Sequence, residues 1–209
     1  MTLDELISTT RAILRDTALP YLWSDELVTM YLNEGQERVA RLTHAFIPDR
    51  RELGLSAGED MYALDADVIY VYSVQLDGYP DRLAPATDGW TPSDSTPSRP
   101  TRYTLDTESG YIRFYNVPDA TYTALLRIAR LPIAMSDSTP ACELMPKFQL
   151  ALPDWAAYRC FTHDDADGRD DKAADRARLR FDDQISDIKY ELYRLQAGFV
   201  PRVHGLRVK

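Results

Sequence analysis

The chain has 209 residues, a net charge of −9 and 44% hydrophobic residues, a composition typical of a globular protein with a sizeable core. The acidic charge argues against broad binding to nucleic-acid phosphates. Because no apolar run is long enough for a signal peptide or a membrane span, we expect a protein that is made in the cytoplasm and stays out of membranes. Two cysteines, Cys142 and Cys160, are too few for a disulfide framework.

Residues 1–52 predict two helices. The first opens with a capping box, Thr2 to Glu5, and ends near Asp16. The second starts after Ser24 as N-cap and ends before Pro48. Its apolar side consists of Leu27, Tyr31, Leu32, Gly35, Val39, Leu42 and Phe46. Glycine in a helix costs about 1 kcal/mol relative to alanine, so Gly35 on this side indicates a close crossing with another helix.

Residues 53–136 change to short segments rich in Val, Ile, Tyr and Leu, which predicts an inserted antiparallel β domain. Asp77-Gly78 is a hairpin turn signal after strand 68–76, residues 103–106 and 110–115 form a second hairpin, and 122–131 is a last strand. Residues 84–100, rich in Pro, Ser and Thr, predict a long exposed loop. Trp90 within this loop is either an anchor or an exposed contact residue.

Residues 137–196 predict the second half of the helical part. Pro146 suits the first position of a helix, and Pro153 should break or kink that helix near its second turn. The stretch from Asp170 to Gln196 predicts a final helix about 40 Å long, around which we expect the chain to be organised. Its stripe should be buried against the two N-terminal helices; the stripe is Ala174, Ala177, Phe181, Ile185, Ile188, Leu192 and Leu195.

These elements predict an α+β protein: a discontinuous helical bundle (1–52 and 137–196) with a long C-terminal helix, an inserted antiparallel β-hairpin domain (53–136) and an extended arm (197–209). The acidic turn His163–Asp171 resembles a calcium loop. However, His163 and Ala174 fall at its first and last ligand positions, so the EF-hand pattern fails at both ends. A solvated helix-capping turn is the favoured interpretation, and a weak divalent site is the alternative.

The sequence gives no positive sign of catalysis, metal binding or a cofactor. Cys160-Phe-Thr-His163 has half the spacing of a zinc site, and the remaining Cys and His residues follow no ligand pattern. The chain contains no phosphate-cradling glycine loop, nucleophile elbow or HExxH motif. We therefore expect a protein that is not an enzyme.

The order of several stretches resembles the head-to-tail adaptor proteins of tailed bacteriophages, also called connector or head-completion proteins. The stretches are TLDELISTTRAILRD, LWSDELVTMYLNEGQERVAR, VYSVQLDGYPDRL, YTLDTESGYIRFYNVPDA, and a Met-Pro-initiated helix with Trp-Ala-Ala-Tyr before the long final helix. They span nearly the whole chain, and their order carries the resemblance.

The resemblance implies a virion structural protein at the neck, synthesised in the host cytoplasm. Such adaptors form a homo-oligomeric ring, commonly twelvefold, in which the helical bundles pack subunit against subunit. The ring lies between the portal protein and a tail or nozzle protein, and double-stranded DNA passes through its lumen without sequence-specific binding. A net charge of −9 per subunit suits a channel that repels the duplex.

Two surfaces are candidate interfaces. Residues 197–209 contain no acid and combine apolar with basic side chains, so we expect a portal-binding arm; packing back onto its own subunit is the alternative. The expected arm contacts are Phe199, Val200, Arg202, Val203, Leu206, Arg207, Val208 and Lys209. The expected tail or subunit contacts of the tyrosine-rich β domain are Trp90, Tyr79, Tyr111 and Tyr115.

Two other functions stay open. One is a tail or baseplate binding module whose β domain holds a fibre or a glycan. The other is a cytoplasmic hydrolase with unrecognised carboxylates.

Overall fold

A computed structural model describes residues 1–44, 49–86, 96–106, 110–137, 139, 141–163 and 169–197. The fold is α+β, and the chain divides into two compact units. The helical unit comprises residues 1–45 and 133–209, and the β unit comprises residues 46–132. The helical unit is therefore built from both ends of the chain, with the β unit inserted between them.

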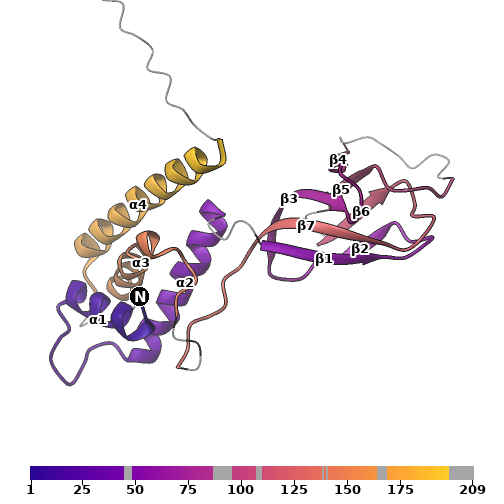
Figure 1. Cartoon of the computed structure of the whole chain (residues 1–209). Helices are drawn as coiled ribbons and strands as arrows, with labels where there is room; N and C mark the ends of the chain where they lie inside the picture. Colours follow the sequence, from indigo (N-terminus) through magenta and orange to yellow (C-terminus); the bar gives the residue numbers. More distant parts are fainter. Residues whose placement is uncertain are drawn as a thin grey trace, which may run out of the picture. The chain divides into compact units, whose positions relative to one another are not determined.

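The helical unit is arranged around its third α-helix. Its elements are α1 (Leu3–Leu14), α2 (Asp25–Thr43), the short 3-10 helix η1 (Pro146–Phe148), α3 (Ala151–Phe161) and α4 (Asp171–Ala197). Helix α3 lies against α1, α2 and α4, and the three surround it in Figure 1. It can do so because it is apolar on almost every side, with Ala151, Leu152, Trp155, Ala156, Ala157 and Cys160 all buried.

The long helix α4 buries the predicted stripe, but against a different partner. Phe181 is fully buried and Ile185 is 5% exposed. The expectation that α1 and α2 cover the stripe missed the main partner, because α4 packs mainly against α3 and secondarily against α2. The rings of Trp155 and Phe181 illustrate the contact, with centroids 4.9 Å apart. The side chain of Leu195 lies outside the described part of the chain.

The predicted helix starts are confirmed, and one helix end differs. Thr2 caps α1 in a reciprocal capping box with Glu5, and Ser24 Oγ accepts a hydrogen bond from the backbone N–H of Leu27 at 3.2 Å. Helix α2 ends at Thr43 because His44 adopts a left-handed conformation with φ 53°. The predicted stop at Pro48 lies outside the described residues, and Leu42, predicted on the apolar side, is 39% exposed.

Two predictions about special residues have different outcomes. Gly35 does mark a close crossing, because a Cβ atom there would lie 3.0 Å from Cδ1 and 3.2 Å from Cβ of Trp155. Pro153 does not break its helix: α3 begins at Ala151, so Pro153 lies in the first turn, where its nitrogen has no intrahelical acceptor to lose. The interruption comes earlier, between η1 and α3.

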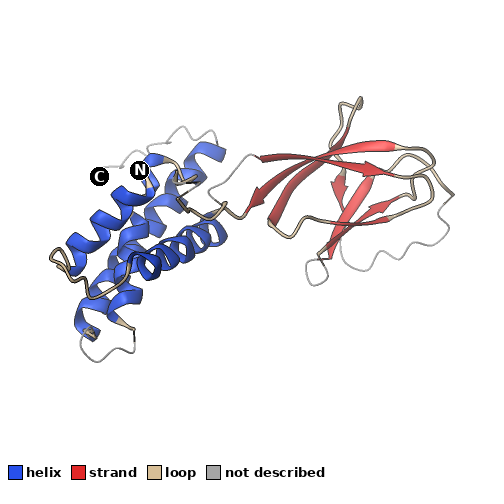
Figure 2. Cartoon of the chain, turned by 90° about the horizontal axis from the view of Figure 1, so that it is seen from below, coloured by secondary structure: helices blue, strands red, loops and turns tan. Residues whose placement is uncertain are grey.

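The β unit consists of two small sheets that share one core. Its strands are β1 (Asp49–Leu55), β2 (Met61–Ala63), β3 (Val68–Leu76), β4 (Ala84–Pro85), β5 (Arg102–Asp106), β6 (Tyr111–Tyr115) and β7 (Tyr122–Arg130). One sheet has the order β1-β7-β3 and the other β2-β6-β5-β4. Figure 2 shows the strands of this unit in red and the helices of the other unit in blue. Val74 and Leu126 from the first sheet and Phe114 from the second belong to the same buried cluster.

The β5–β6 hairpin is confirmed, with Leu105 opposite Ile112. A turn does form at Asp77-Gly78, where Gly78 has φ 77°, but the return segment contributes only an isolated bridge between Gln75 and Arg82. The main partner of β3 is instead the distant β7. The unit is also not wholly antiparallel, since β4, predicted as loop, pairs in parallel with β5.

Candidate functional site

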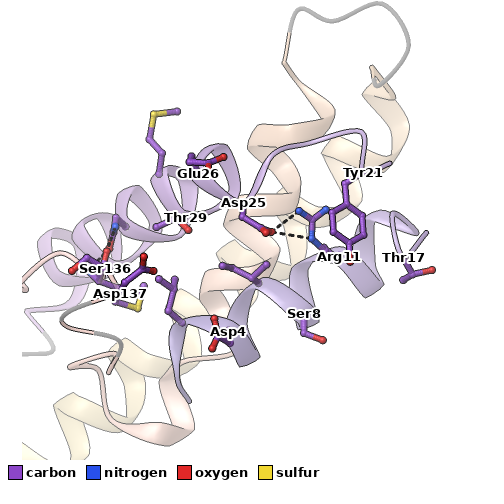
Figure 3. A pocket seen from close by; sticks show the side chains of 15 residues that line it. Asp4, Ser8, Arg11, Thr17, Tyr21, Asp25, Glu26, Thr29, Ser136 and Asp137 are labelled. Atoms are coloured by element: carbon purple, nitrogen blue, oxygen red, sulfur yellow. Dashed lines mark hydrogen bonds and ion pairs between the residues drawn. The ribbon is translucent and has the colours of Figure 1, made fainter. Parts of the chain in front are cut away.

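An open groove of the helical unit lies between α1, α2 and the segment Met135–Asp137, with a volume of about 880 Å³. Its walls come from distant parts of the chain, because 135–137 lie beyond the inserted β unit. Leu3, Ile7, Met30 and Met135 give it an apolar lining, and Asp4, Glu26 and Asp137 are exposed carboxylates along it (Figure 3).

A buried arginine fixes one end of the groove. Arg11 is 5% exposed. Its Nη1 lies 2.8 Å from Asp16 Oδ2 and its Nη2 lies 2.6 Å from Asp25 Oδ1. Nη2 also donates to the carbonyl of Trp23 at 2.9 Å, and the guanidinium carbon lies 3.6 Å from the ring centroid of Tyr21 (Figure 3). These contacts tie the loop between α1 and α2 to α1, so the guanidinium serves the fold.

Amide side chains of α2 fix the opposite wall. Asn33 Nδ2 donates to the carbonyl of Met135 at 2.9 Å, and Asn33 Oδ1 accepts from the backbone N–H of Met135 at 2.7 Å. One turn further, Gln36 Nε2 donates to the carbonyl of Ile133 at 3.0 Å. Because these bonds satisfy backbone groups of an extended segment, the segment is held against α2 without secondary structure of its own.

The electrostatics of the groove suit a segment with apolar and basic side chains. A hydrogen bond from its own backbone N–H, helped by the hydroxyl of Ser24, holds the pKa of Glu26 below its ordinary value. Glu26 therefore stays ionised at neutral pH. The groove presents carboxylates, and the only arginine among its lining residues is already occupied by Asp16 and Asp25.

The predicted interface residues of the β unit differ in exposure. Tyr111 is 40% exposed on β6, whereas Tyr115 on the same strand is 7% exposed and faces the interior. Tyr79 is half-buried, with its ring centroid 6.2 Å from that of Tyr122 and 4.6 Å from the guanidinium carbon of Arg99. Trp90 and the whole predicted arm from Phe199 to Lys209 lie outside the described residues.

The cysteine and histidine residues do not form a reactive site in the described part of the chain. Burial raises the pKa of the Cys160 thiol to about 12 and also raises that of Cys142. His163 Nδ1 lies 3.0 Å from the hydroxyl of Tyr31. No cluster of three metal-ligating side chains occurs among the described residues, and most of the acidic turn, residues 164–168, lies outside them.

Sequence reasoning missed the arginines. Arg11 lies on the buried face of α1, together with Leu3, Thr10 and Leu14. A charged residue on an otherwise uncharged helical face could have indicated its structural role. Arg38, Arg159 and Arg178 come from three helices and line one pocket of their own. Their sequence positions carry no common pattern.

None of the helices that the structure describes is both long enough and apolar enough to cross a membrane. No curated protein sequence is significantly similar to the chain. A family model described as SU10 adaptor protein matches residues 1–202. Because this match extends over nearly the full length, the chain belongs to the SU10 adaptor protein family, a family of structural, non-enzymatic phage adaptor proteins.

Proposed function

We propose that this protein is the head-to-tail adaptor of a tailed phage, located at the neck of the virion. In this role twelve copies form a ring between the portal protein and a tail or nozzle protein, and the duplex passes through the lumen. The observation that carries the proposal is the family match over residues 1–202, which extends over both units and ends within the arm, after its first six residues.

The helical unit is suited to be the rigid body of the ring. Its core is continuous around α3, and the side chains of half-buried Asn33 and buried Gln36 pair with backbone groups. A rigid body keeps the geometry of its surface constant, so every copy can make the same contact with its neighbour, as a closed ring requires.

The portal contact is assigned to the arm that follows α4. Its apolar and basic residues are Phe199, Val200, Arg202, Val203, Leu206, Arg207, Val208 and Lys209. Such a segment is too short to fold alone, and it would bury its apolar groups on docking. Of the tyrosines predicted to make a tail or subunit contact, Tyr111 is exposed, whereas Tyr115 is buried.

Electron microscopy and native mass measurement of the purified protein, alone and mixed with its portal, test the proposal. We expect a ring of twelve copies, formed either alone or on the portal. A protein that remains monomeric at high concentration and binds no portal would be incompatible with this function.

A tail or baseplate binding module is the second candidate, favoured by the exposed rings of Tyr70 and Tyr111 in the β unit. Aromatic faces of this kind can stack on sugars or on a fibre. Titration with phage receptor glycans, using the variants Tyr70→Ala and Tyr111→Ala, distinguishes it. Saturable binding that both variants lose would favour the module over the ring.

A further inference from the structure

A second pocket of the helical unit gathers positive charge in an acidic protein. It has a volume of about 420 Å³ and is lined from α2, α3 and α4. Each helix contributes one arginine: Arg38, Arg159 and Arg178. Glu34 is the carboxylate among its lining residues, whereas the chain as a whole has a net charge of −9.

Each of these arginines lies over an aromatic ring of the same pocket. The guanidinium carbon of Arg38 lies 4.5 Å from the ring centroid of Trp155, and that of Arg159 lies 5.0 Å from Tyr31. The third, Arg178, lies 5.7 Å from the centroid of Tyr158. A guanidinium stacked on a ring still has its N–H donors at its edges, where they can bind an anion.

The three arginines differ in how far they are already neutralised. Arg159 Nη1 lies 2.6 Å from Glu34 Oε1, and Arg178 Nε lies 3.8 Å from Asp182 Oδ2 in a pair whose side chains are both more than half exposed. Arg38 makes its cation–π contact with Trp155 but no hydrogen bond or ion pair with any described residue. The pocket therefore has a net positive charge and at least one cation available for a ligand.

A further hydrogen-bond donor is buried at the same place. Trp155 is 5% exposed, and its Nε1 has no hydrogen-bond partner among the described residues. Buried polar groups without a partner are uncommon in folded proteins. The indole N–H is fully buried, so the guanidinium of Arg38 is the donor that a ligand in the pocket can reach, and it favours an acceptor with negative charge.

We propose that this pocket binds a carboxylate side chain presented by an acidic segment of a partner protein. Guanidinium and carboxylate groups match in charge and in fork geometry. A single open pocket of this size accommodates one such group. Duplex DNA instead needs an extended basic track, which a chain of net charge −9 opposes.

Thermal unfolding followed by helical circular dichroism tests the proposal, with succinate as the carboxylate probe and sodium chloride at matched ionic strength as reference. We expect succinate at about ten times its dissociation constant to raise the Tm by about 3–5 °C. Arg38→Gln should abolish the rise. Arg41→Gln should keep it, because Arg41 is exposed on the same helix and pairs with Glu37 outside the pocket.

Four outcomes would overturn the proposal. The first is no rise in any variant, and the second is an equal rise in Arg38→Gln. The third is a rise with inorganic phosphate or a short DNA duplex but none with succinate. The fourth involves Asp164, Asp165 and Asp167, which follow His163 and lie outside the described residues. If succinate raised the Tm only after all three were changed to Asn, the pocket would be occupied by carboxylates of its own chain.

A second readout follows the ligand directly. The indole Nε1–H signal of Trp155, assigned in ¹⁵N-labelled protein by its loss in Trp155→Phe, should shift with succinate concentration in the parent and in Arg41→Gln. An unmoved signal alongside a raised Tm would place the ligand elsewhere and also refute the proposal.

Discussion

Buried polar side chains connect the helices of this protein at defined points. Arg11 holds the loop between α1 and α2, and Gln36 holds the extended segment after the β unit. Asp154, 5% exposed on α3, accepts from Arg180 Nε at 2.7 Å and from Gln184 Nε2 at 2.8 Å, both on α4. Because a buried polar group without its partner is costly, each connection favours one relative position of the two elements that it joins.

The close approach of α2 and α3 gives a prediction for Gly35→Ala. Alanine improves the helix propensity by about 1 kcal/mol, but its Cβ would lie 3.0 Å from Trp155 Cδ1. Overpacking of this kind costs about 1–3 kcal/mol, so after the gain in propensity we expect a net loss of up to about 2 kcal/mol in urea unfolding. Gly54→Ala in β1 is the control, since no atom lies within 4 Å of the added Cβ. Equal stability of the two variants would contradict the crossing.

The thiol of Cys160 should be unreactive in the native protein. Burial raises its pKa to about 12, and only the thiolate is a good nucleophile. At pH 8 we expect Cys160 in a Cys142→Ser variant to react with a disulfide reagent at least about 100-fold more slowly than in urea. Fast labelling of the folded variant would show that the helical unit opens at α3.

The same burial makes the stability depend on alkaline pH. In the unfolded chain the thiol loses its proton near pH 8.5, whereas the native thiol keeps it until about 12. The unfolded state is therefore favoured as the pH rises through this window. The free energy of unfolding should fall more steeply between pH 9 and 10 in the parent than in Cys160→Ala; parallel curves would exclude this contribution.

At the scale of elements, α3 organises the helical unit although α4 is the longest and most regular helix. The stripe of α4 was visible from its 3.6-residue period. Eight of the eleven residues of α3 are buried, Asp154 among them, so no single apolar stripe with a 3.6-residue period marks it as central. Which helix covers Phe181 depends on this arrangement. The sequence therefore predicted that Phe181 is buried but did not predict its main partner helix.

Phe181→Ala tests the contact between α3 and α4. Phe181 is fully buried against Trp155, so removing the ring should cost about 3–5 kcal/mol in equilibrium denaturation. Leu179→Ala on the same helix is the matched control, because Leu179 is 63% exposed and its loss should cost less than about 0.5 kcal/mol. A loss for Phe181→Ala as small as that for Leu179→Ala would refute the packing.

Local pairings in the β unit could be predicted from the sequence, and distant pairings could not. The β5–β6 hairpin has its turn signal within ten residues of both strands. The central strand β7 instead pairs with β1 and β3, placing Asp49 opposite Ile128 and Val74 opposite Leu126. Alternation tells which face of a strand is buried but not which strand lies beside it.

The arginine pocket could not be predicted from the sequence for a similar reason, since Arg38, Arg159 and Arg178 meet only when three helices pack.

At the scale of the whole molecule, two separated segments complete one helical core. Helices α1 and α2 pack against α3, which follows the entire β unit in the sequence. The core therefore requires contacts across about ninety residues, which slows folding relative to a bundle of consecutive helices.

Deleting residues 199–209 should separate assembly from stability. Terminal segments with few contacts contribute little to folding, so the truncated protein should stay within about 1 kcal/mol of the parent in equilibrium denaturation. It should also lose co-sedimentation with portal-bearing heads, because the apolar and basic side chains of the arm would be missing. The matched control removes only the positive charges of the arm, in the triple variant Arg202→Gln, Arg207→Gln and Lys209→Gln. Because its apolar side chains remain, this variant should bind heads more weakly without losing binding entirely.

The alternative is that the arm packs on its own subunit, and the groove between α1 and α2 offers it a complementary surface. Its carboxylates Asp4 and Glu26 would meet the basic residues, and Met30, 53% exposed, would meet the apolar ones. In that case truncation should destabilise the parent by well over 1 kcal/mol, and Met30→Ala should destabilise the full-length chain but not the truncated one. Head binding that survives truncation would also exclude the arm as the portal contact, whatever its effect on stability.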